Sequence, residues 1–138
     1  MDAQRRSFPA KHASLTGIME FVELCGRELR LPPALTMKLL LIVEELFLNA
    51  VNYGCDSSTH TPVLLQLARA GNEVALKFED CGIPYNPFAH IDRARHEAPL
   101  AERPVGGLGV MLVEGFASHV DYARVDDRNR IEVWLKVC

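Results

Sequence analysis

The chain has 138 residues, the length of one ordinary domain, and 49% of them are apolar while 24% are charged. This composition is typical of a globular protein with a sizeable core. The formal net charge is -3 and the 15 Lys and Arg residues are scattered, which argues against a nucleic-acid or anionic-membrane partner. No apolar run reaches the roughly 18 residues of a membrane span. We therefore expect a single domain over residues 1–138 with neither nucleic acid nor membrane as a direct partner.

The four cysteines show neither CxxC spacing nor a mixed His/Cys pattern of metal ligands, and the start of the chain has no secretory signal. We interpret these side chains as reduced thiols, which predicts a cytoplasmic location and argues against a zinc site.

The first half of the chain predicts a short strand and two helices. Residues 6–10 fit an edge strand, since Pro9 is tolerated there. Apolar residues then recur at helical spacing over residues 11–31, and the Pro32-Pro33 pair separates this helix from the next. The second helix is predicted from about Ala34 to Tyr53, with Gly54 as its stop.

The second half changes to strand patterns. Residues 62–68 and 73–79 alternate between apolar and polar, and Gly71-Asn72 between them indicates a hairpin. A long segment with four prolines, about 83–105, is a candidate lid. Helical spacing returns after Gly109, and two further strands are predicted on either side of residues 126–129.

The order of elements is therefore strand, helix, helix, strand, strand, loop, helix, strand, strand. It predicts an α/β (α+β) fold, a two-layer sandwich in which helices cover one face of a mixed, mostly antiparallel sheet.

A polar stripe interrupts the apolar second helix. Glu45, Asn49 and Asn52 fall within about 60° of arc on a helix, whereas Glu44 points elsewhere. Polar side chains beside a core need partners, and a Mg²⁺ ion with a phosphate chain would supply them. The alternative for this helix taken alone is an ordinary solvated face.

Two glycine-containing turns follow. Asp80 ends a predicted strand and Gly82 allows a tight turn, so the carboxylate is free to accept a hydrogen bond from a nucleobase or merely to shape the turn. The run Gly106-Gly107-Leu108-Gly109 opens a predicted helix, where unpaired N–H groups and the helix dipole favour an anion. It matches neither the GxGxxG nor the Walker pattern. In their shared order, the three motifs indicate an ATP pocket.

With these motifs the chain resembles the GHKL (Bergerat-fold) ATPases. Glu45-Leu-Phe-Leu-Asn49-Ala resembles their N box, Asp80-Cys-Gly82-Ile-Pro84 the first glycine box, and Gly106-Gly-Leu-Gly109 the second. The short single-domain form and the run from Glu102 to Gly109 most resemble the anti-sigma-factor serine kinases of bacterial partner-switching systems.

The resemblance implies the Bergerat fold, ATP and Mg²⁺ as cofactors, and roles for the matching residues. Asn49 would coordinate Mg²⁺, Glu45 would be the general base, and Asp80 would receive the adenine amino group. Arg103 in the lid would reach the terminal phosphate. The remaining residues assigned to the nucleotide site are Asn52, Gly82, Gly106, Gly107, Leu108 and Gly109.

By resemblance, the expected function is a serine/threonine-protein kinase that phosphorylates a small STAS-type antagonist and sequesters a sigma factor. One alternative is an ATP-dependent binding module that has lost phosphoryl transfer, and another is a structural domain without nucleotide. The resemblance also implies a homodimer, with the first helix and the strand near Phe8 as candidate surfaces. The five histidines lie in no phosphoacceptor setting, which argues against a sensor histidine kinase.

Overall fold

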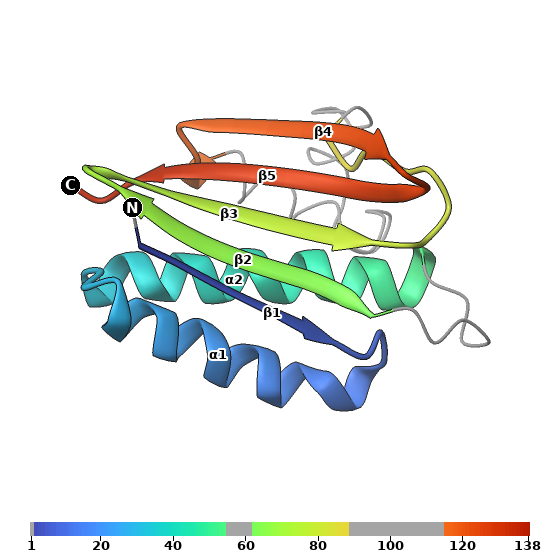
Figure 1. Cartoon of the computed structure of the whole chain (residues 1–138), viewed down its shortest axis with the longest axis horizontal. Helices are drawn as coiled ribbons and strands as arrows, with labels where there is room; N and C mark the ends of the chain where they lie inside the picture. The colour runs from blue at the N-terminus through green and yellow to red at the C-terminus, as the bar shows by residue number, and fades with distance from the viewer. Residues whose placement is uncertain (1, 55–61, 89–114) are drawn as a thin grey trace, which may run out of the picture.

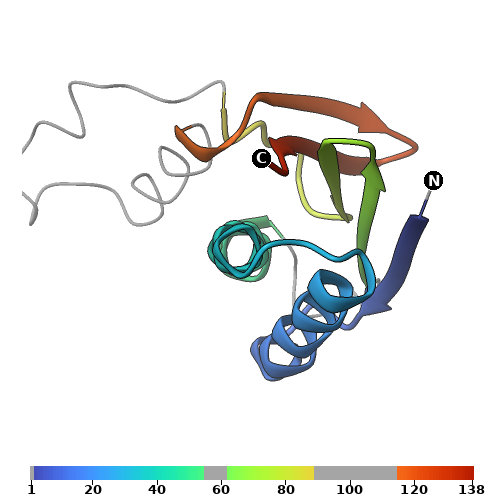
Figure 2. The ribbon, with the colours of Figure 1, turned by 90° about the vertical axis from the view of Figure 1, so that its left-hand side faces the viewer.

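One antiparallel sheet forms the frame of the domain, and two long helices cover one of its faces (Figures 1 and 2). The computed structural model describes residues 2–54, 62–88 and 115–138. The five strands are ordered β1-β2-β3-β5-β4. The strands are β1 (Asp2–Phe8), β2 (Val63–Ala70), β3 (Glu73–Asp80), β4 (His119–Val125) and β5 (Arg128–Lys136). The helices are α1 (Leu15–Glu28), preceded by a 3-10 turn (His12–Ser14), and α2 (Pro33–Asn49), followed by a π-helical turn (Ala50–Gly54).

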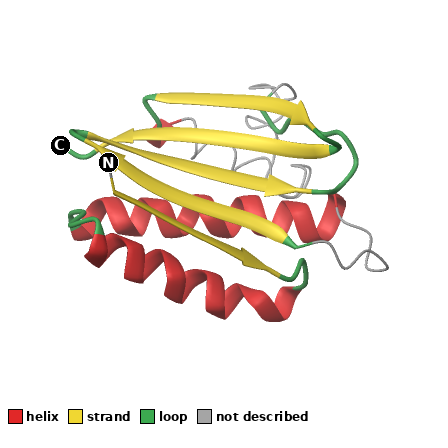
Figure 3. Ribbon diagram, viewed as in Figure 1, coloured by secondary structure: helices red, strands yellow, loops and turns green. Residues whose placement is uncertain are grey.

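The predicted two-layer α+β sandwich is confirmed (Figure 3). All neighbouring strands in the described ranges pair antiparallel, in agreement with the mostly antiparallel sheet expected from the sequence. None of the described helices has the combination of length and hydropathy that a membrane span needs.

The core lies between the sheet and the two helices. The apolar row of β3 faces α2, and its partner in β5 faces the same way, because Phe78 pairs with Ile131. The same alternation continues one step further, to the pair Asp80 and Asn129. Both of these polar residues are buried. Two apolar rows therefore end in facing polar side chains at one end of the sheet.

The separation of the two helices at Pro32-Pro33 is confirmed, and α1 ends before it in a Schellman motif. Arg30 has a φ of 57°, and the N–H of Leu31 donates to the carbonyl of Gly26 at 2.8 Å. The N–H of Arg30 donates to the carbonyl of Arg27 at 3.1 Å. The chain thus turns into Pro33, the first residue of α2.

Several boundaries differ from the sequence-based expectations, and the first helix, expected over residues 11–31, is regular only over Leu15–Glu28. Strand β1 starts earlier and ends at Phe8, before Pro9, which has no N–H to donate to a ladder. The regular part of α2 ends at Asn49, and only the π-helical turn continues to the predicted stop at Gly54. The last hairpin turns at Asp126-Asp127, both with positive φ, so Arg128 and Asn129 belong to β5 rather than to the turn.

Part of the predicted structure lies outside the described residues. The candidate lid of about 83–105 is described only as far as Phe88, and the helix predicted after Gly109 is described only at Gly115–Phe116.

A close contact sets the approach of the two helices. Gly26 of α1 is buried against Thr36 of α2, and a Cβ at position 26 would lie 2.5 Å from Oγ1 and 2.9 Å from Cγ2 of Thr36. At Gly17, earlier in α1, a Cβ would meet only the ring of Phe8 at 3.8 Å. The first glycine is therefore required by packing, and the second is not.

We expect Gly26→Ala to lower the free energy of unfolding by about 1–3 kcal/mol, the usual cost of overpacking. Gly17→Ala is the matched control, and we expect it to raise that free energy by up to about 1 kcal/mol through helix propensity. Adding Thr36→Ala to Gly26→Ala removes both clashing atoms and should recover most of the lost free energy of unfolding. Urea denaturation measures all four proteins, and a Gly26→Ala variant as stable as wild type would contradict the packing argument.

Candidate functional site

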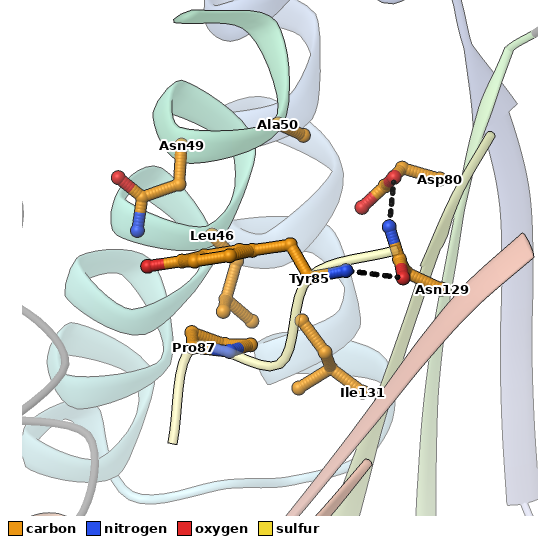
Figure 4. Close-up of a pocket in the computed structure, with 8 residues that line it drawn as sticks. All are labelled: Leu46, Asn49, Ala50, Asp80, Tyr85, Pro87, Asn129 and Ile131. Atoms are coloured by element: carbon orange, nitrogen blue, oxygen red, sulfur yellow. Dashed lines mark hydrogen bonds between the residues drawn. The ribbon is translucent and has the colours of Figure 1, made fainter. Parts of the chain in front are cut away.

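A cavity of about 20 Å³ opens where the C-terminal end of α2 faces the ends of β3 and β5 (Figure 4). It has room for about one water molecule. Its wall combines apolar side chains with a few polar ones, the usual composition of a small-molecule site. The lining residues are Leu46, Asn49 and Ala50 from the helix side, Asp80, Asn129 and Ile131 from the sheet, and Tyr85 and Pro87 from the segment that follows β3.

Asp80 is the buried carboxylate of this site. Its exposed fraction is 5%, and one oxygen, Oδ1, accepts hydrogen bonds from the N–H of Gly82 at 2.8 Å and from Asn129 Nδ2 at 3.0 Å. The other oxygen, Oδ2, has no hydrogen-bond partner among the residues that the structure describes, and Figure 4 shows it pointing toward the cavity. This oxygen is not among the fully buried side-chain atoms that lack a partner in the described structure, so it stays accessible from the cavity and can accept a donor from a ligand.

Glu45 and Asn49 lie one turn apart on α2, as the helical spacing predicts. Asn49 Nδ2 donates to Glu45 Oε1 at 3.3 Å, and both side chains are half-buried. This bond uses the amide nitrogen and leaves Asn49 Oδ1 without a partner in the described part of the chain. Burial raises the pKa of Glu45, although the bond from Asn49 lowers it and the nearby Glu44 raises it slightly further.

The donor set fits a magnesium ion shared with a nucleotide better than a metal cage built by the protein alone. Within residues 2–54, 62–88 and 115–138, no three His, Cys, Asp or Glu side chains are arranged to hold a metal. Asn49 Oδ1 is an oxygen ligand of the kind that Mg²⁺ accepts. Mg²⁺ is commonly bound by one or two protein groups together with phosphates, so a single amide oxygen at this place is compatible with it.

The structure describes only some of the other residues that were assigned from the sequence. Gly82 is buried and is held by its bond to Asp80. Asn52 is exposed in the π-helical turn and is not among the residues that line the cavity, so its role stays a prediction. The residues that lie outside the described ranges are Arg103, Gly106, Gly107, Leu108 and Gly109.

Asn129 belongs to the site but is not among the residues assigned from the sequence. The sequence predicts it in a turn, whereas the structure places it in β5 opposite Asp80. The signal was present, because Asn129 is in phase with Ile131 and Val133 and is the polar member of an otherwise apolar row. What the sequence did not supply was the register that pairs the row with β3.

Charged contacts brace the same strand ends. On the opposite face of the sheet, Glu79 accepts a bond from Arg130 Nε at 2.7 Å and lies 3.4 Å from Arg128 Nε. The bond to Glu79 raises the pKa of Arg130. On the side of the cavity, Arg124 Nη1 donates to the carbonyl of Gly82 at 2.8 Å. These contacts tie the β4–β5 hairpin to the end of β3 and to the turn that follows it.

The family model described as the histidine kinase-like ATPase domain matches residues 8–135, which is nearly the whole chain. A comparison with curated proteins gives no match.

We expect Asp80→Asn to weaken ATP binding at least about tenfold, or ~1.4 kcal/mol, because the cavity-facing acceptor is exchanged for an amide that also carries a donor. Calorimetric titration with Mg-ATP measures the loss. Asp121→Asn is the control, since Asp121 is exposed on β4 and accepts a bond only from the N–H of Tyr122 in the described structure. Equal affinity of Asp80→Asn and wild type would remove Asp80 from the site.

Proposed function

Because the chain belongs to the histidine kinase-like ATPase domain family, we propose that it binds Mg-ATP beside Asp80 and transfers the terminal phosphoryl group to a serine or threonine of a protein substrate. ATP binding is the property that the family implies. The observation that carries the proposal is the cavity itself. It brings Asp80 from β3 opposite Asn49 from α2, and Asn49 is bonded to a half-buried carboxylate, Glu45.

The adenine base of ATP would bind between the C-terminal end of α2 and the ends of β3 and β5. Leu46, Ala50 and Ile131 offer apolar surface to the flat faces of a purine, and Asp80 Oδ2 offers an acceptor to its amino group. A cavity of about 20 Å³ is far too small for a base. Binding therefore requires Tyr85 and Pro87, which line the cavity from the segment after β3, to move outward.

The phosphate end would lie toward Asn49. Mg²⁺ bound with the nucleotide would neutralise charge that develops on the phosphates. The contribution of the chain is to orient: Asn49 presents Oδ1, and its Nδ2 holds Glu45 in place. Phosphoryl transfer depends mainly on such positioning and on charge stabilisation.

Glu45 would act as the general base, accepting the proton of the attacking hydroxyl. A base works best when its pKa approaches the working pH, and burial shifts the pKa of Glu45 in that direction. The retained carboxylate favours a kinase over a binding module that has lost phosphoryl transfer.

The proposed substrate is a small STAS-type antagonist, and the proposed client is a sigma factor that the chain sequesters. The support is the resemblance of Glu102–Gly109 to the anti-sigma-factor kinases. A homodimer, with contacts near α1 and Phe8, belongs to the same proposal.

The first test concerns the role of Glu45 as the general base. We expect Glu45→Gln to reduce phosphoryl transfer by about 10²–10⁴ while Mg-ATP affinity stays within a few-fold, because the amide keeps the shape but accepts no proton. Glu44→Gln is the matched control, since Glu44 is the exposed neighbour on the same helix. Transfer of radiolabelled phosphate from ATP to a purified antagonist is the measurement. Undiminished transfer by Glu45→Gln would exclude it as the base.

The pH dependence is a separate test. The base acts only when ionised, so transfer should fall as the pH drops through the pKa of Glu45. Because burial raises that pKa, the midpoint should lie above the ordinary value of 4.5. Glu44→Gln removes a like charge and should move the midpoint to lower pH. A rate profile whose midpoint moves upward in this variant would contradict the assignment.

A further inference from the structure

Asn129 is the most thoroughly bonded side chain of the site, and it takes no part in the function proposed so far. We infer that Asn129 is a positioning residue that makes the site selective for adenine over guanine, by holding the carboxylate of Asp80 in one orientation. The inference rests on the proposed function, because it assumes that Asp80 receives the base.

The hydrogen bonds of Asn129 leave it no capacity for a ligand. The residue is 2% exposed. Its Nδ2 donates to Asp80 Oδ1 at 3.0 Å and to the carbonyl of Ile83 at 2.8 Å, which uses both hydrogens. Its Oδ1 accepts from the N–H of Tyr85 at 3.2 Å and from the hydroxyl of Tyr122. Asn129 therefore acts on a bound base only through its neighbours.

The bond from Asn129 restricts the rotation of the Asp80 carboxylate. Asp80 Oδ1 is held from two sides, by the backbone of Gly82 and by Asn129, so Oδ2 is left toward the cavity as an acceptor in a fixed place. Bonds to a charged acceptor are the stronger ones. The geometry is maintained by the strand pairing itself, since Asp80 and Asn129 are directly opposite in the register of β3 and β5.

A fixed acceptor distinguishes the two purines. Adenine carries an amino group where guanine carries a carbonyl oxygen, and two acceptors facing each other repel. Guanine also carries a donor amino group at another position of its ring. A carboxylate that is free to rotate would be able to find that donor, so discrimination depends on the orientation that Asn129 imposes.

The same amide also holds one wall of the cavity. Its bonds to the carbonyl of Ile83 and the N–H of Tyr85 fix the backbone from which the side chain of Tyr85 lines the cavity. Asn129 thus fixes the acceptor and the backbone at Tyr85, so the outward movement that a bound base requires is confined to the side chain of Tyr85 and to the segment beyond it. A purely structural role in the turn would use the same bonds, but its loss would weaken both nucleotides alike.

The test compares Mg-ATP and Mg-GTP by calorimetric titration of wild type and Asn129→Asp. The variant keeps the shape and the acceptor oxygen but loses both donors. It also puts a second carboxylate opposite Asp80, and repulsion between the two turns the Asp80 carboxylate away from the orientation that the bond from Asn129 imposes. We expect the ratio of ATP to GTP affinity to fall at least about tenfold, equivalent to ~1.4 kcal/mol.

Asn72→Asp is the matched control, because Asn72 lies in the β2–β3 turn and its Oδ1 accepts the N–H of Cys138, a role that a carboxylate keeps. If Asn129→Asp does not fold, Tyr122→Phe removes one of the four bonds and keeps the ring. The ratio of ATP to GTP affinity should also fall in this variant, by at least about twofold or ~0.4 kcal/mol.

The outcomes separate the two claims. Wild type that binds neither nucleotide would defeat the proposed function, and the inference with it. Wild type that binds ATP without preference over GTP would overturn the inference alone. An unchanged affinity ratio in Asn129→Asp, or in Tyr122→Phe where the first variant does not fold, would assign Asn129 a structural role only.

Discussion

The hydrogen bond between Asp80 and Asn129 is the constraint on which the site depends. It joins the ends of two neighbouring strands, and both partners are buried. A carboxylate placed there without donors would destabilise the fold. Asn129 and the N–H of Gly82 in the turn after β3 donate to one oxygen, and the other points toward the cavity. The same contact therefore satisfies the folded chain and prepares an acceptor in a place that solvent hardly reaches.

The second half of the site depends on the packing of α2 against the sheet. Leu46 and Phe47 are buried in the core, and this fixes the rotation of the helix about its axis. With that rotation set, Asn49 lines the cavity and holds Glu45. Asn49 on the helix and Asp80 on a strand end thus both line the same cavity (Figure 4). In the proposed function, Asp80 is the acceptor for the base and Asn49 is the oxygen ligand for the metal, and both are held by hydrogen bonds to neighbouring residues.

Much of this arrangement could be predicted from the sequence, because it depends on local spacing. The contact between Glu45 and Asn49 follows from their separation on a helix, and the helix break follows from Pro32-Pro33. The β2–β3 hairpin follows from Gly71, which has a φ of 61°. The lid and the second glycine motif stay predictions, since they lie outside the described residues.

The role of Asn129 could not be predicted, because it depends on long-range strand register. Four residues that read as a turn in the sequence form a two-residue turn, Asp126-Asp127, and the start of β5. The shift places Asn129 opposite Asp80. A period-two pattern indicates the face of a residue but not its partner on the next strand. The small size of the cavity also could not be predicted from the sequence, because it depends on where Tyr85 lies in three dimensions.

The most direct test is a crystal structure of the chain with Mg²⁺ and a non-hydrolysable ATP analogue. We predict that the adenine amino group lies within hydrogen-bond distance of Asp80 Oδ2, that the bond between Asp80 and Asn129 is intact, and that the side chain of Tyr85 is displaced outward. A base bound elsewhere, or bound here with its amino group turned away from Asp80, would contradict the account.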